Sequence, residues 1–221
     1  MSDQLQISRQ YLWSDSLFEI KIPNANNQAI VDFYEIGSKS HKGDARSNIG
    51  GWQFPMKDGM CEEYDQIMDR IVEGVNHIAN NVMGMSLIIE MSNSWINTNK
   101  LGAKNAFHTH PGCLFSGVYY AKVPKIGDPG YINFVREGHH QIESTLAFFA
   151  DHYAQQRLEQ NGGDDRDMQW ITHMTVPPVE SSALIFPSWY GHEVYTSLSE
   201  KEDRIAVGMN FSPRLTSENN K

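Results

Sequence analysis

The chain has 221 residues with 27 Asp and Glu against 18 Lys and Arg, a net charge of −9 that argues against bulk nucleic-acid binding through phosphate attraction. Hydrophobic residues make up 40% and aromatic residues 11%, which indicates a folded globular core. No apolar run approaches the ~20 residues of a membrane span, and the first residues lack the basic-then-apolar order of a secretory signal. Cys61 and Cys113 are too few for a disulfide framework, so we expect a cytoplasmic protein.

Residues 1–84 predict strands and a helix that precede the main fold. Residues 17–23 alternate like a strand that ends at a proline, and residues 28–36 are compatible with a short helix or a strand. Residues 62–82 predict an amphipathic helix, whose off-stripe His77 we expect to be solvated. Its apolar stripe repeats at spacings of four, four, three and four: Ile67, Ile71, Val75, Ile78 and Val82.

From residue 85 the pattern is mainly short strands. One interruption, at about 138–163, has helical spacing and predicts an insertion that is either a lid beside the site or a helix that covers a sheet edge. No linker divides the chain, so we expect a single domain with a core at 85–213 and a polar tail at 214–221. The predicted fold is mainly β with flanking helices, a double-stranded β-helix of the jelly-roll, cupin-like kind.

Two histidines, His108 and His110, lie two positions apart in a predicted strand. Alternate strand residues share a face, so both rings can approach one ion. Pro111 follows at once and places the pair at a strand end, and the distant His192 has a similar setting after a proline and a glycine. The three histidines predict a transition-metal site, although bonding of each ring to its neighbours is the simpler alternative.

Arg204 begins a predicted strand in which one face carries small or polar residues, including Ala206 and Gly208. Exposed strand faces prefer larger residues, so this face is expected to line a cavity. A guanidinium at its end is suited to hold a carboxylate by two hydrogen bonds. Tyr120 is a candidate for a further hydrogen bond to the same carboxylate. Asn97 and Asn105 are weaker candidates for polar contacts near the site. Trp95 and Trp189 are expected to serve packing alone.

Several motifs together resemble a known family, the 2-oxoglutarate–Fe(II) oxygenases, in a bacterial and phage branch related to prolyl hydroxylases. The resemblance spans about 85–213. It implies a double-stranded β-helix, His192 as the distal iron ligand, Arg204 as the partner of the far carboxylate of 2-oxoglutarate, and Tyr120 as its second contact. The motifs are Trp95-Ile96-Asn97, Asn105 with His108-Thr109-His110-Pro111-Gly112, Ser116-Gly117-Val118-Tyr119-Tyr120, Phe186-Pro187-Ser188-Trp189 with His192, and Arg204 with Asn210-Phe211.

The chain departs from the wider superfamily at two positions. His110 stands where that superfamily has an Asp or Glu ligand, so either three histidines bind the metal or water or a remote acid completes the site. Ala206 stands where relatives often have a serine, which removes one hydrogen bond to the co-substrate.

The leading hypothesis is an Fe(II)- and 2-oxoglutarate-dependent dioxygenase that couples decarboxylation of 2-oxoglutarate to succinate with oxidation of a substrate. The alternatives are a cupin-type metal protein that does not use 2-oxoglutarate, and a jelly-roll scaffold without activity. The substrate, a small molecule or a peptidyl group, is not identified by the sequence, because fold analogy does not establish function. A homodimer formed through an edge strand is a further hypothesis.

Overall fold

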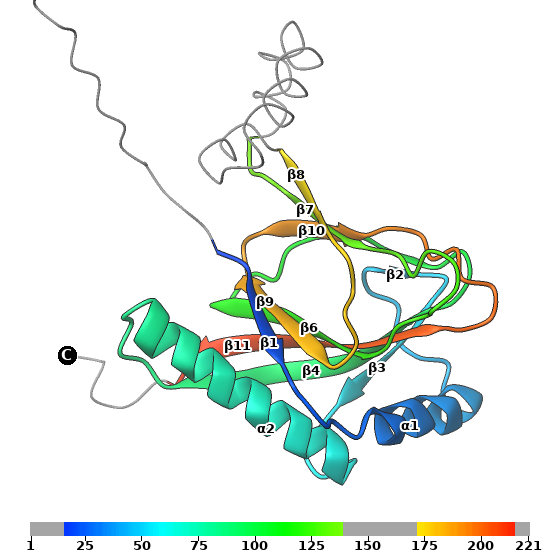
Figure 1. The fold of residues 1–221 in the computed structure, drawn as a ribbon, viewed down its shortest axis with the longest axis horizontal. Coiled ribbons are helices and arrows are strands. Elements are labelled where there is room, and N and C mark those ends of the chain that lie inside the picture. The colour runs from blue at the N-terminus through cyan, green and yellow to red at the C-terminus, as the bar shows by residue number, and fades with distance from the viewer. Residues whose placement is uncertain (1–15, 139–171, 215–221) are drawn as a thin grey trace, which may run out of the picture.

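In a computed structural model, residues 16–138 and 172–214 are described. Two antiparallel β-sheets face each other, and two helices lie on the outer side of the larger sheet (Figure 1). The predicted jelly roll with flanking helices is therefore confirmed. The insertion expected at 138–163 lies, from residue 139 on, outside the described residues, as does the tail after Arg214. No helix in the described ranges is long and apolar enough to span a membrane.

Each sheet is assembled from strands that are distant in the sequence. The smaller sheet has the order β2 (Asn48–Ile49), β5 (Lys104–His108), β10 (Gly191–Val194), β7 (Ile132–Val135) and β8 (His173–Val176). The larger sheet has the order β1 (Phe18–Lys21), β9 (Ser182–Pro187), β6 (Phe115–Lys122), β11 (Arg204–Pro213), β4 (Ile89–Asn99) and β3 (Trp52–Met56).

The helices cover the outer face of the larger sheet. Helix α1 (Asn27–Ser40) occupies the segment that the sequence left open between helix and strand. Helix α2 (Glu62–His77) is followed by a π-helical turn at Ile78–Val82. Four residues of the predicted stripe are buried, but Val82 is 61% exposed, so its assignment to the stripe was wrong. The π turn changes the angular phase and moves Val82 off the buried face. His77 is exposed, as expected.

The protein has two apolar cores of different size. The larger one lies between the helices and the outer face of the larger sheet. The smaller one lies between the two sheets and consists of Tyr120, Ile132, Phe134, Leu184, Phe186 and Ala206. The space between the sheets is therefore filled only in part by hydrocarbon, and buried polar side chains occupy the rest.

Truncation of the helix stripe should destabilise the protein only where the stripe is buried. Ile71 is fully buried, and Ile71→Ala leaves a cavity, so we expect a loss of about 2–5 kcal/mol in the free energy of unfolding. The measurement is urea denaturation followed by circular dichroism. Val82→Ala is the matched control and should change stability by less than about 0.5 kcal/mol. Equal losses in the two variants would contradict the observed helix phase.

Candidate metal centre

His108 and His192 lie opposite each other in the smaller sheet. Strands β5 and β10 pair antiparallel, with His192 opposite His108 and Val194 opposite Asn105. Three steps along β5 therefore match two steps along β10, which is a β-bulge. A bulge re-aims side chains next to it. Here Asn105 and His108, three positions apart, both line the cavity between the sheets.

His110 reaches the same place from the irregular segment just after β5. Strand β5 ends at His108, so the expected alternation of both histidines along one strand is wrong in detail. The backbone N–H of His110 donates to the carbonyl of Ser188, 3.0 Å away, in the segment just before β10. The indole of Trp95 stacks on the His110 ring at 5.7 Å between centroids. These contacts direct the third imidazole toward the other two.

The three imidazoles form one compact group. Each ring offers one nitrogen, and these nitrogens all lie within 4.8 Å of one another. The Nδ1 of His108 lies 2.7 Å from the carbonyl oxygen of Ala106, and the Nδ1 of His192 lies 3.0 Å from that of Tyr190. A carbonyl only accepts, so both Nδ1 atoms carry the proton and both Nε2 atoms keep a free lone pair. This is the tautomer that a metal ligand needs.

The environment keeps these rings uncharged. Burial, and to a smaller extent the neighbouring imidazoles, lowers the pKa of His192 to about 3 and that of His110 to about 4. Burial also lowers the pKa of His108. The free site near neutral pH therefore presents three neutral nitrogen donors, a set that suits Fe(II) and other first-row divalent metals. Within the described ranges no Asp or Glu joins the group. Glu193 instead accepts a hydrogen bond from Asn133.

Arg204 lies in the same cavity, at the start of β11. Its side chain is 2% exposed. Nη1 donates to the carbonyl of Gly130 at 2.5 Å, Nη2 donates to Oδ1 of Asn99 at 2.9 Å, and Nε has no partner. No acidic side chain of the described segments lies within 4.0 Å of this guanidinium. The result is a buried cation with free donors and no counter-charge from those segments.

A cluster of buried amides stands beside Arg204. Asn97 donates to Oδ1 of Asn99 at 2.7 Å and to Oδ1 of Asn105 at 3.2 Å, and Asn105 also donates to Ser47 at 3.3 Å. The cluster bridges β4 and β5, one strand from each sheet. Asn97 lines the cavity as expected, but its amide is engaged within the cluster. The role of Asn99 was missed, although its spacing of two from Asn97 on one strand was a signal for it.

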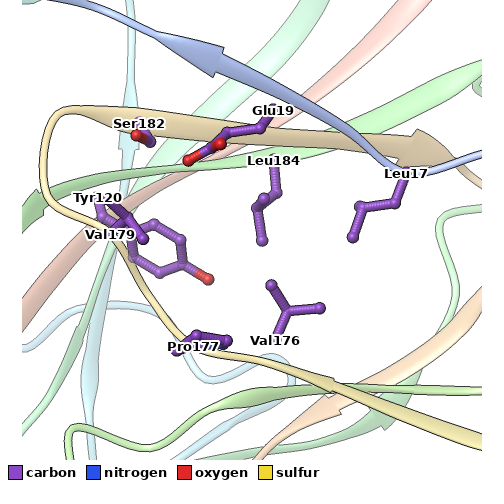
Figure 2. A pocket seen from close by; sticks show the side chains of 8 residues that line it. All are labelled: Leu17, Glu19, Tyr120, Val176, Pro177, Val179, Ser182 and Leu184. Atoms are coloured by element: carbon purple, nitrogen blue, oxygen red, sulfur yellow. The ribbon is translucent and has the colours of Figure 1, made fainter. Parts of the chain in front are cut away.

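Tyr120 separates the metal cavity from a second cavity of about 270 Å³. Its side chain is 2% exposed, and burial raises the pKa of its phenol to about 12, so the hydroxyl remains a donor. Figure 2 shows this hydroxyl directed into the space bounded by Leu184, Val176 and Pro177. Tyr120 also lines the metal cavity together with Arg204, where its position lies opposite Ala206 on β11.

The small face of β11 is less open than the sequence suggested. A Cβ at Gly208 would lie 2.4 Å from Cε2 of Trp95, so the indole lies directly against this glycine. Ala206 belongs to the apolar core between the sheets. Glycine at 208 thus makes room for the aromatic wall beside His110, and only part of this face borders empty space.

The chain is similar in structure to several solved proteins. No curated protein matches the chain. Among solved structures, a Pseudomonas putida prolyl-4-hydroxylase is similar at a TM-score of 0.62 and 14% identity, covering 91% of this chain and 95% of that one. The collagen prolyl hydroxylase of Paramecium Bursaria Chlorella virus-1, in complex with 2-oxoglutarate, gives 0.55 and 12%, covering 88% and 94%. HygX from Streptomyces hygroscopicus, with nickel and 2-oxoglutarate bound, gives 0.59 and 12%, covering 92% and 85%. These similarities show a shared fold.

The family is identified by the sequence match. The model of the family described as "Putative 2OG-Fe(II) oxygenase" matches residues 93–210, more than half of the chain. The matched segment contains the three clustered histidines, Arg204 and Tyr120. The chain therefore belongs to the 2-oxoglutarate–Fe(II) oxygenase family.

Proposed function

We propose that the chain is an Fe(II)- and 2-oxoglutarate-dependent dioxygenase, a hydroxylase in which His108, His110 and His192 hold the iron. One observation carries this proposal: three neutral imidazoles and a buried guanidinium without a counter-charge face a single cavity. When bound, the iron supplies the redox chemistry that couples decarboxylation of 2-oxoglutarate to succinate with oxidation of the substrate.

The ligand set determines the charge at the metal. Fe(II) with three neutral imidazoles and dianionic 2-oxoglutarate sums to zero, whereas replacement of one imidazole by a carboxylate gives −1. The protonated Nδ1 atoms of His108 and His192, bonded to backbone carbonyls, fix the ring orientation before the metal arrives. The three histidines of the chain would thus position the metal without adding negative charge to it.

Arg204 and Tyr120 hold the far carboxylate of 2-oxoglutarate. The free Nε–H of Arg204 and its remaining Nη protons are donors in a desolvated setting, where charge-assisted hydrogen bonds are strong. The ring of Tyr120 lines the same cavity and its phenol stays protonated, but its hydroxyl is directed into the second cavity, so we assign the main contact to Arg204 and the weaker one to Tyr120. Asn97 is a weaker contact to the co-substrate, because its amide is already engaged.

The substrate enters the cavity beside the metal, and its identity is open. Two similar structures are prolyl hydroxylases, so a peptidyl proline is a class to test alongside small molecules.

We also propose that residues 1–221 form one domain in a cytoplasmic protein, with Cys61 and Cys113 both free. A homodimer would use one of the sheet edges, which are β1, β3, β2 and β8.

Assembly of iron and co-substrate should be visible without turnover. Metal-depleted protein mixed with Fe(II) and 2-oxoglutarate under anaerobic conditions should develop a charge-transfer band in the visible, because the 2-oxo acid chelates the metal. His192→Ala should abolish the band. Arg204→Ala should retain it but require about 100-fold more 2-oxoglutarate, the cost of losing a charge-assisted pair.

His77→Ala is the control, because this exposed histidine lies on the surface of α2 and should leave the band unchanged. Absence of the band in the wild type at saturating 2-oxoglutarate would refute the proposed function. Metal binding with no dependence on Arg204 would instead favour a cupin-type protein that does not use this co-substrate.

Metal affinity should fall far less between pH 7.5 and 5.5 than it would for three imidazoles of ordinary pKa. Protons compete with the metal only below the pKa of each ligand, and burial lowers the pKa of all three histidines, to about 4 for His110 and about 3 for His192. Three imidazoles with the ordinary pKa of 6.5 would lose affinity by about 1000-fold over this range. Titration with Co(II) by calorimetry measures the difference, and a loss of that size would contradict a desolvated triad.

A further inference from the structure

The neighbours of Arg204 are unusual for a buried cation, because all of them are neutral. A buried arginine is ordinarily stabilised by a carboxylate that accepts two hydrogen bonds. Here the two acceptors are a backbone carbonyl, from Gly130, and a side-chain amide, from Asn99. The Nε atom has no acceptor. The positive charge of Arg204 is therefore not neutralised by any of the described protein groups.

Asn99 is held in one orientation. Arginine can only donate, so the amide must present its oxygen to Nη2. The same oxygen accepts from Asn97 at 2.7 Å, and the Nδ2 of Asn99 donates to Asn105 at 3.2 Å. Asn99 is 1% exposed. It also lies opposite Arg204 in the β4–β11 register. Hydrogen bonds to residues of both sheets thus hold its position.

An aspartate would fit this position in size and shape. It would accept the same hydrogen bond from Arg204 and would strengthen it by adding a charge. It would also neutralise the guanidinium before any ligand arrived. Asparagine makes the hydrogen bond without cancelling the charge.

We infer that Asn99 is a positioning residue that aims Arg204 and keeps its charge uncompensated, and thereby selects a 2-oxo acid with a second carboxylate at its far end. The inference rests on the proposed function and extends it to co-substrate selectivity. Selection acts at the far end only, because the hydrogen bonds of Asn99 go to Arg204 and to neighbouring amides and not to the three histidines.

Asn99→Asp separates this role from a purely structural one. The aspartate keeps the contact to Arg204 but loses the hydrogen bond that Nδ2 of Asn99 donates to Asn105, so the thermal midpoint of unfolding should fall by less than it does in Asn99→Ala. The dissociation constant for 2-oxoglutarate, read from the anaerobic Fe(II) charge-transfer band, should rise by about 100-fold. Binding of 2-oxopentanoate, which has a methyl group in place of the far carboxylate, should change by less than about threefold. The wild-type preference for the dicarboxylic acid should therefore disappear.

Two further variants control the experiment. Asn93→Asp adds the same charge at an exposed position of β4, away from Arg204, and should leave both dissociation constants unchanged. Asn99→Ala removes the amide but leaves Arg204 charged. It should lower the thermal midpoint more than Asn99→Asp does, yet weaken 2-oxoglutarate binding less. A structural role would make affinity follow stability, which is the opposite order.

The outcomes distinguish the two proposals. A wild-type protein that gives no band with either acid refutes the proposed function. A wild-type band with 2-oxoglutarate, together with Asn99→Asp binding it within threefold of the wild type, overturns the present inference alone. Equal weakening of both acids by Asn99→Asp also overturns it, because the effect would then lie at the metal end.

Discussion

A buried cation needs a counter-charge, and Arg204 finds none among the described protein groups. Burial of an isolated charge is costly, and a chain normally offsets it with an acidic side chain. Residues around Arg204 provide hydrogen bonds without charge, from Gly130 and Asn99. A site of this kind is at its most stable when an anion occupies it. The electrostatics of the protein thus support the proposal that this cavity takes an anionic ligand, independently of any comparison with relatives.

The same amides that keep Arg204 charged also connect the two sheets. Asn97 and Asn99 come from β4 of the larger sheet, and Asn105 comes from β5 of the smaller one. Further along β5, beyond the bulge, lies His108. A single hydrogen-bonded network therefore fixes the distance between β4, which carries Asn99, and β5, which carries His108. Hydrogen-bonded networks of buried side chains rigidify a core in this way. Here the network holds in place both Arg204 at one end of the cavity and His108 at the other.

Much of this arrangement could be predicted from the sequence, because strands and helices leave strong periodic signals. The predicted burial of the apolar stripe was correct at Ile71 and wrong at Val82. A π-helical turn shifts the helical phase at Val82, and no proline or glycine within that turn signals the change in the sequence. His108 and His110 were recognised by their spacing, but alternation on one strand was the wrong reason. The strand ends at His108, and a backbone hydrogen bond to Ser188 brings His110 inward.

Features that depend on pairing between distant segments could not be predicted. The bulge that directs both Asn105 and His108 inward arises from register with β10, about 85 residues later in the chain. The contact of Trp95 with Gly208 likewise depends on the pairing of β4 with β11. The family resemblance supplied the roles of His192, Arg204 and Tyr120, but it could not supply Asn99, whose significance lies in a hydrogen bond across strands.

Two neutral side chains at the site, His110 and Asn99, act in the same direction. His110 stands where a carboxylate ligand is usual, and Asn99 stands where a buried arginine usually meets an acid. Each replaces a negative group by a neutral one of similar bonding capacity. In the proposed function, a divalent metal at one end and a guanidinium at the other face the cavity without negative side chains from the described segments. A ligand with one negative group leaves one end unbalanced, whereas a dianion with its charges at opposite ends satisfies both. Neutrality of the protein groups, at two points rather than one, is the physical basis of the proposed preference for a diacid.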